Sequence, residues 1–449
     1  MARTSGPILG LNIGSTTTKA VELKEGREGI ELVGRPAVFP TPTEMVQGGV
    51  VVDPEGLGKY LAEMLGEAEV RTKKVVSSVS GQQSLVVRIT EVPRMQVSEL
   101  KEAIQWELER QTPFPVDEII YDYAPIIRPD EDVSTPNMEV LLAVAQEEMI
   151  NMHVEALAKA GLVPLHIDIE PLASARSLVA LAGERYAGQT IVVVSIGAQA
   201  TEISVVREGL LTFVRTIPTA GESLTRAIGQ GFIVETEEAE RLKRAHADLR
   251  AGQAAMGGGG PPMPGPPDTG GLDLGGGTPP QGAAPAPYQM GSDQPVFELS
   301  STDDLQPQAA PPGDGATQLE YPAPAGAPPA PVPAAAPALD PDMEYTRRQI
   351  YDTIVPVLAE LTTEVRRSLD FYRRQHRNEQ IHFLALTGGT ARIPGIDAFF
   401  ANEVGVPAIV ANPYQDIIND PDRSPAEFLR DIGPMTAVAV GLACRDMVD

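Results

Sequence analysis

The sequence predicts an α/β protein built from two related halves. Segments rich in β-branched and apolar residues alternate with segments of helical periodicity along most of the chain. The stretch "ILGLNIGSTTTKAVELKEG" (8–26) is repeated in outline by "IVVVSIGAQATEISVVREG" (191–209); each has an apolar strand, Ile-Gly, a small polar turn and a second strand. A proline-rich stretch at about 251–340 separates two folded blocks. The repeated hairpin indicates duplicated halves that face each other across a cleft.

Strands are predicted where apolar and β-branched residues cluster between Gly and Pro. They lie at 8–14, 19–24, 74–80, 85–92, 137–145, 165–170, 190–197, 200–209 and 381–389. Gly161 ends a helix predicted over 146–160, and a shorter helix follows the strand at 165–170.

Three further helices are predicted from apolar spacing. Ser98 is the expected N-cap of a helix over 99–111, in which Leu100, Ile104 and Leu108 repeat every four residues. A helix over 344–375 has one apolar stripe, made by Ile354, Leu358, Leu361, Val365 and Leu369, and Pro356 marks a kink or a new start in it. The stretch 431–445 is expected to be a buried helix.

Composition limits the classes of function. With 449 residues and 42% hydrophobic content, the chain is long enough for two or three domains with buried cores. A formal charge of −26 and a pI near 4.6 argue against nucleic acid or anionic lipid as the main partner. A single cysteine, Cys444, suits a reducing compartment, and no apolar run approaches the roughly 20 residues of a membrane span. We therefore expect a cytoplasmic protein.

The stretch 251–340 is predicted to be a disordered, acidic insertion. It holds 20 of the 42 prolines and no Lys or Arg, so it cannot bury enough apolar surface to offset its ordering entropy. Its apolar patch "PVFELSSTDD" (295–304) is either a short docking motif or a chance cluster in a linker. The insertion can serve as a spacer or as a tether for another protein.

The turns of the two hairpins carry groups that bind phosphate. The first offers backbone amides at Gly14, a row of hydroxyls and the ammonium of Lys19. One such hairpin is weak evidence, because any hairpin turn favours Gly, Ser and Thr. The second hairpin, together with a Gly-Gly turn at Gly388 and Gly389 after a buried strand, favours a nucleotide site.

These motifs resemble, in order, those of the actin and chaperone ATPase superfamily. They are phosphate loops at "NIGSTTTK" and "SIGAQATE", hinges at "DIEPLASA" and "DIGPMTAVAVGLA", and an adenosine loop at "LTGGTARIPG". The resemblance implies a bilobed actin-like (ribonuclease H-like) ATPase fold that binds ATP or ADP, with or without Mg²⁺. The implied nucleotide-binding residues are Asn12, Gly14, Ser15, Thr16, Thr17, Lys19, Ser195, Gly197, Thr201, Glu240, Lys243, Gly388, Gly389 and Thr390.

Within the superfamily, the sequence resembles the PilM family of type IV pilus assembly proteins. The stretch 99–123 looks like the small extra subdomain that this family shares in outline with the division protein FtsA, and 213–228 is similarly close. The resemblance implies a scaffold at the inner face of the inner membrane that binds the cytoplasmic N-terminal peptide of the membrane protein PilN. We expect that the chain does not bind nucleic acid and does not itself insert into the membrane.

The implied domain order follows the superfamily. The expected segments are 1–82, first-lobe core; 83–165, extra subdomain; 166–190, return to the first lobe; 191–250, second lobe; 251–340, insertion; 341–430, second lobe continued; and 431–449, closing helix on the first lobe.

Two positions depart from active members of the superfamily. Each phosphate loop of an active member supplies an aspartate that holds the waters around Mg²⁺, whereas these positions are Asn12 and Ser195 here. An amide or a hydroxyl offers a hard cation only a dipole, so we expect poor Mg²⁺ placement and no efficient ATP hydrolysis. Glu170 matches the hinge residue that orients the attacking water in active relatives, but an acid beside Pro171 is equally compatible with a structural role.

Other chemistry has little support. The histidines lack ligand spacing, so no metal site is predicted; they are His153, His166, His246, His376 and His382. Cys444, in an apolar terminal helix, is expected to be a core residue rather than a nucleophile. Trp106 either borders a partner groove or packs in the core.

Two other functions remain alternatives. The first is an active ATPase or sugar-kinase-like enzyme, which Asn12 and Ser195 disfavour. The second is an FtsA-like division adaptor, for which the acidic ending "RDMVD" differs from a basic membrane-binding helix.

Overall fold

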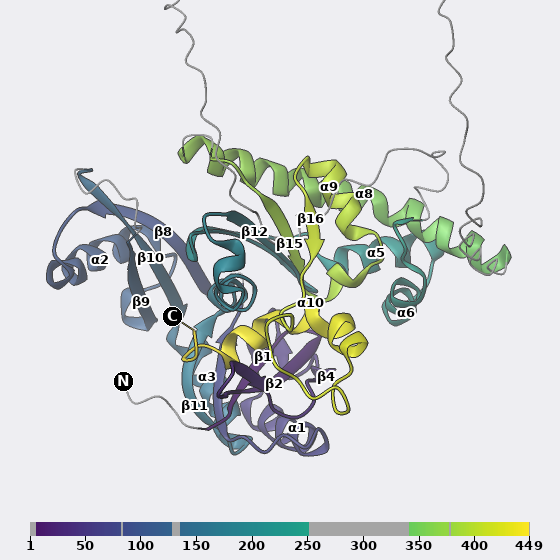
Figure 1. Cartoon of the computed structure of the whole chain (residues 1–449), viewed down its shortest axis with the longest axis horizontal. Helices are drawn as coiled ribbons and strands as arrows, with labels where there is room; N and C mark the ends of the chain where they lie inside the picture. Colours follow the sequence, from purple (N-terminus) through teal and green to yellow (C-terminus); the bar gives the residue numbers. More distant parts are fainter. Residues whose placement is uncertain (1–5, 82–83, 128–134, 251–340, 377–378, 449) are drawn as a thin grey trace, which may run out of the picture. The chain divides into compact units, whose positions relative to one another are not determined.

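Two β-sheets with the same strand order form the centre of the fold (Figure 1). The computed structural model describes residues 6–81, 84–127, 135–250, 341–376 and 379–448. These residues belong to one compact unit. The predicted insertion at 251–340 lies outside the described residues.

The first sheet has the order β11-β7-β1-β2-β3, with β4 also pairing with β2. Its strands are β1 (Ile8–Ile13), β2 (Thr17–Glu25), β3 (Ile30–Leu32), β4 (Ala37–Pro40), β7 (Lys74–Val79) and β11 (Val163–Ile169). The hairpin β1–β2 is antiparallel, whereas β7 runs parallel to β1 and β11 parallel to β7.

The second sheet repeats this plan with the order β14-β13-β12-β15-β16. Its strands are β12 (Thr190–Ile196), β13 (Thr201–Arg207), β14 (Leu210–Ile217), β15 (Phe383–Thr387) and β16 (Ala408–Val410). Again the hairpin β12–β13 is antiparallel, and β15 and β16 follow in parallel. The predicted duplication of the two halves is confirmed.

Helices cover the sheets in layers because each sheet is apolar on both faces. One face of the first sheet packs on α1 (Pro54–Glu67) and α3 (Glu147–Lys159). Its other face packs on α4 (Glu170–Ala175) and α10 (Ala426–Ala443). One face of the second sheet packs on four helices (Figure 1). They are α5 (Gly221–Phe232), α6 (Thr236–His246), α8 (Pro341–Gln375) and α9 (Ile396–Val404).

A separate three-stranded sheet follows β7 in the chain. It has the order β8-β10-β9, with β8 (Leu85–Pro93), β9 (Ile119–Ile126) and β10 (Asn137–Gln146). Helix α2 (Val97–Gln111) covers one face of it through Leu100, Ile104 and Leu108, which are fully buried as their spacing predicted. A two-stranded ribbon, β5 (Val46–Gln47) and β6 (Val50–Val51), completes the strands. The domain boundaries expected from the sequence, such as 83–165 for the extra subdomain, remain predictions.

The start of one helix differs from the sequence-based expectation, and two alternatives left open by the sequence are decided. Helix α2 begins at Val97 rather than after Ser98, and Gln96 is its N-cap, with a backbone amide that donates to the Glu99 carboxylate at 3.2 Å. Helix α8 continues through Pro356 without a new start. Trp106 is 74% exposed on the outer side of α2, so core packing is excluded for it. Cys444 is fully buried, as expected for a core residue.

Candidate functional site

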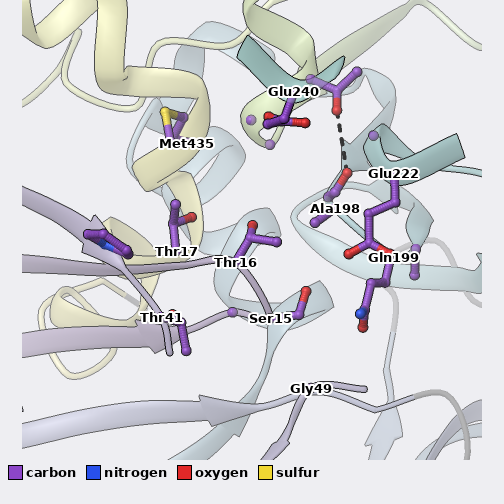
Figure 2. Close-up of a pocket in the computed structure, with 18 of the residues that line it drawn as sticks. Ser15, Thr16, Thr17, Thr41, Gly49, Ala198, Gln199, Glu222, Glu240 and Met435 are labelled. Atoms are coloured by element: carbon purple, nitrogen blue, oxygen red, sulfur yellow. Dashed lines mark hydrogen bonds between the residues drawn. The ribbon is translucent and has the colours of Figure 1, made fainter. Parts of the chain in front are cut away.

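The turns of both hairpins line one large pocket of about 1990 Å³. Figure 2 shows Ser15, Thr16 and Thr17 of the first turn and Ala198 and Gln199 of the second around it. Small-molecule sites commonly enclose about 300–1,000 Å³. The pocket therefore has room for a nucleotide.

The two turns have the same local geometry. The amide of Gly14 donates to the Thr17 carbonyl at 3.1 Å, and the amide of Gly197 donates to the Ala200 carbonyl at 3.0 Å. A Cβ atom at Gly14 or at Gly197 would lie 2.9 Å from that same carbonyl oxygen. Glycine is therefore required at both positions, because the backbone closes on itself more tightly than a side chain permits.

The second turn is joined to the start of α5. The amides of Gly221 and Glu222 donate to the carbonyls of Gly197 and Ala198 at 3.0 and 2.8 Å. The positive end of the α5 dipole thus lies beside the second turn, where it favours a bound anion.

A charged cluster lies beneath the first turn. The amide nitrogen of Asn12 donates to Glu170 Oε1 at 2.9 Å and to Ser78 Oγ at 3.2 Å, and the Ser80 side chain also hydrogen-bonds to Glu170. Burial lowers the pKa of the Lys19 ammonium, and the charge of Glu170 partly opposes this. Burial likewise raises the pKa of Glu170, against the effects of Lys19 and Asn12. These two charges therefore stabilise each other in a desolvated site.

A third carboxyl group lies close to this cluster. Burial raises the pKa of Glu202, on β13, well above its ordinary value, and the negative charge of Glu170 adds to this shift. Burial and the neighbouring carboxylate therefore both favour the neutral form of Glu202.

On the opposite wall, Lys243 of α6 is held by a polar network. Its ammonium donates to the Gly221 carbonyl at 3.0 Å and to Thr225 Oγ1 at 2.7 Å, and it forms a 2.6 Å ion pair with Glu240. Burial opposes the charge of Glu240, but hydrogen bonds from Lys243 and Thr225 hold the pKa of that carboxyl below its ordinary value. The pair Glu240–Lys243 is thus fixed at the pocket wall.

The structure brings nearly all of the predicted site residues to this pocket. The residues that line it are Asn12, Gly14, Ser15, Thr16, Thr17, Lys19, Glu170, Ser195, Gly197, Glu240, Lys243, Gly388, Gly389 and Thr390. Thr201 does not line the pocket, so its predicted place at the nucleotide site is corrected. Its side chain is fully buried on β13 and its hydroxyl donates to the Thr219 carbonyl at 2.8 Å.

The third glycine turn is tied to α10 rather than free. The Gly388 amide donates to the Pro434 carbonyl at 2.7 Å, and Gly388 has a φ of +89°, which favours glycine. Thr390 follows it and its hydroxyl donates to the Gly197 carbonyl at 3.4 Å. This turn therefore lies beside the second hairpin turn.

Several lining residues were not predicted. They are contributed by the start of α5, the second turn, β4–β6 and α10, and include Gly221, Glu222, Thr225, Gln199, Thr41 and Met435. The signal for the α5 group was present in "TAGESLTRAI", where a turn of small residues precedes a helical stretch. The other residues carry no local signal, because their place at the pocket depends on distant elements.

The donor set does not fit a magnesium ion. Mg²⁺ favours carboxylate oxygens and water in near-octahedral geometry. At the first turn the Asn12 amide nitrogen is directed at Glu170 and Ser78, and at the second turn Ser195 offers a hydroxyl. In the described part of the chain, no three or more His, Cys, Asp or Glu side chains are grouped so that they could hold a metal ion.

The duplicated sheets and the pocket lined by both hairpin turns define a protein of the bilobed actin-like class. The family model described as "Type IV pilus assembly protein PilM" matches residues 10–250 and 343–447. The chain therefore belongs to the PilM family of type IV pilus assembly proteins.

Individual relatives agree with this assignment. The chain is similar to a solved structure titled "PilM-PilN type IV pilus biogenesis complex", with 27% identity, a TM-score of 0.70 and coverage of 100% of both chains. It is also 24% identical over 256 residues to the cell division protein FtsA of Bacillus subtilis (strain 168). That match spans 52% of this chain and 56% of FtsA, so only about half of the FtsA length is represented.

None of the helices within the described ranges combines the length and the apolarity needed to cross a bilayer.

Proposed function

We propose that this chain is a scaffold of the type IV pilus machinery that binds the cytoplasmic N-terminal peptide of PilN and a nucleotide. The observation that carries the proposal is the similarity, over the full length of both chains, to the PilM–PilN complex at 27% identity. Binding to PilN would hold the protein at the inner face of the inner membrane through a protein contact.

The pocket supports the nucleotide part of this proposal. The hydroxyls of Ser15, Thr16 and Thr17 line the pocket and can donate to phosphate oxygens. The positive end of the α5 dipole also favours a bound anion there. Lys243 and Glu240 lie on the wall where the superfamily resemblance implies contacts to adenine and ribose. A nucleotide that contacts both turns would link the two halves and bias the angle between them.

Efficient hydrolysis is not part of the proposed function. Glu170, the candidate for positioning water, already accepts hydrogen bonds from Asn12 and Ser80 and faces Lys19. The loops lack the two carboxylates that would place Mg²⁺, on whose charge phosphoryl transfer depends.

The test is calorimetric titration of the full chain with a synthetic peptide from the cytoplasmic N-terminus of its PilN, with and without Mg-ATP. Saturable one-to-one binding is expected, and a scrambled peptide of the same composition serves as the control. A change of affinity on adding ATP would show that the pocket communicates with the peptide site. If the peptide does not bind in either condition, the proposed scaffold role is wrong.

A further inference from the structure

Beside the first phosphate-binding turn, the half-buried Lys19 of β2 has an ammonium group without a hydrogen-bonding partner among the described residues. Within the described residues, Lys19 forms no hydrogen bond and no ion pair within 4 Å, although it lies against the turn: a Cβ atom at Gly14 would be 3.0 Å from its Nζ. Lys243, the other buried ammonium of the pocket, is fully engaged by Gly221, Thr225 and Glu240. A desolvated charge without a hydrogen-bonding partner is costly, so Lys19 is poised to accept an anionic ligand.

The groups around Lys19 are engaged with one another. Both amide hydrogens of Asn12 are used, by Glu170 at 2.9 Å and by Ser78 at 3.2 Å. Glu170 is also hydrogen-bonded to Ser80 and is the charge that opposes the lowered pKa of Lys19. Asn12 and Ser80 thus position Glu170 as the counter-charge of Lys19.

This arrangement supplies positive charge in a different way from a metal site. A divalent cation at the first turn would need carboxylate oxygens, but the Glu170 carboxylate beneath that turn is already hydrogen-bonded and faces the lysine. An ammonium that is part of the chain, in contrast, brings its charge to the phosphates without any ion from solution.

We propose that this pocket binds the polyphosphate of its nucleotide without a divalent cation, with Lys19 as the positive charge at the first turn and Asn12 and Glu170 as residues that position it. This inference rests on the proposed nucleotide binding and concerns how the same site works. Glu170 then acts on the lysine and not on an attacking water.

The experiment is calorimetric titration of the full chain with ATP at equal ionic strength, in excess EDTA and in excess Mg²⁺. We expect dissociation constants that agree within about twofold, far below the tenfold change that corresponds to about 1.4 kcal/mol. An affinity at least about tenfold higher in Mg²⁺ would overturn the inference and leave the proposed nucleotide binding intact. No binding of ATP in either buffer would refute the proposed nucleotide binding itself.

Two variants test the role of the lysine. Lys19→Met is expected to weaken ATP binding in EDTA at least about tenfold, because it removes a charge-assisted contact to phosphate. Lys24→Met is the matched control on the same strand; its ammonium pairs with Glu31 at 2.7 Å outside the pocket, so ATP affinity is expected to be unchanged. Equal affinity for Lys19→Met and the unmodified chain, with matching circular dichroism spectra, would overturn the role of Lys19.

A third variant restores the two carboxylates. The double substitution Asn12→Asp and Ser195→Asp places acidic groups beside Glu170 and across the pocket, where they repel phosphate unless a cation is bound. ATP affinity of this variant is expected to rise at least about tenfold from EDTA to Mg²⁺. If the unmodified chain shows the same rise, the inference is wrong.

Discussion

Substitution of Gly441 by alanine should destabilise the protein, because α10 crosses α4 in backbone contact at this position. A Cβ atom at Gly441 would lie 1.8 Å from the carbonyl oxygen of Ala173 and 2.5 Å from its carbonyl carbon. Both atoms belong to the backbone of a buried helix, so neither can move as a flexible side chain would. Nonbonded heavy atoms are most stable at about 3.5–4.0 Å, so the helices would have to separate by more than about 1 Å.

The cost has three parts. Overpacking of a well-packed site typically costs about 1–3 kcal/mol. The Gly441 carbonyl also accepts a hydrogen bond from Arg176 Nη1 at 2.9 Å, and a bond to a charged donor contributes about 1.5–3 kcal/mol. Alanine returns about 1 kcal/mol through its higher helix propensity. The net loss in the free energy of unfolding should therefore be about 1.5–5 kcal/mol.

Urea denaturation followed by circular dichroism measures this loss. The matched control is Gly66→Ala in the last turn of α1, where no atom lies within 4 Å of the new Cβ. The free energy of unfolding of that control should rise by about 0.4–1 kcal/mol, because alanine restricts the conformations of the unfolded chain. An unchanged or higher midpoint for Gly441→Ala would refute the reasoning that the two helices meet at their backbones.

Three further predictions concern the cores. Leu358 on α8 is fully buried, so Leu358→Ala should lower the free energy of unfolding, measured by urea denaturation, by about 2–5 kcal/mol. Leu358→Met should lower it by less than about 1.5 kcal/mol. Burial raises the pKa of the Cys444 thiol to about 12, so iodoacetamide at about pH 8 should label it only in urea; rapid labelling of the native protein would contradict this. Burial lowers the pKa of His153 from 6.5 to about 4, so the unfolded chain binds the proton first and stability falls as the pH drops through this window. Over that pH range, the free energy of unfolding of the unmodified chain should fall by about 3 kcal/mol relative to that of His153→Gln. Parallel pH profiles of the two free energies would contradict the prediction.

Local patterns predicted much of the fold. The apolar runs located β1, β2, β12 and β13, and the four-residue spacing located α2 and the buried stripe of α8. Helix α1 was not predicted although its signals are present: Asp53 caps it, Pro54 is its first residue, and its buried leucines repeat every four positions. Strand β9 was missed as well, because it lies directly after a turn in a stretch interpreted only by family resemblance.

The candidate site was predictable to the extent that its residues lie in turns. Gly14 and Gly197 are required by hydrogen bonds that span only three residues, so the local sequence alone indicates their role. Thr201 was misplaced because a hydroxyl next to a turn can point either way on a strand, and here it bonds to Thr219. Trp106 likewise lies outside the core because α2 buries only the stripe of Leu100, Ile104 and Leu108.

By itself, then, the sequence determined the two hairpins, their glycine turns and the apolar faces of the helices, since these depend on neighbours a few residues away. Only the tertiary structure decided that Asn12 donates to Glu170, 158 residues later, and that the ammonium of Lys19 has no hydrogen-bonding partner in the described part of the chain. It also decided that α10 meets α4 at Gly441. Such contacts follow from strand order and from the packing of layers, which place residues together that no local spacing relates.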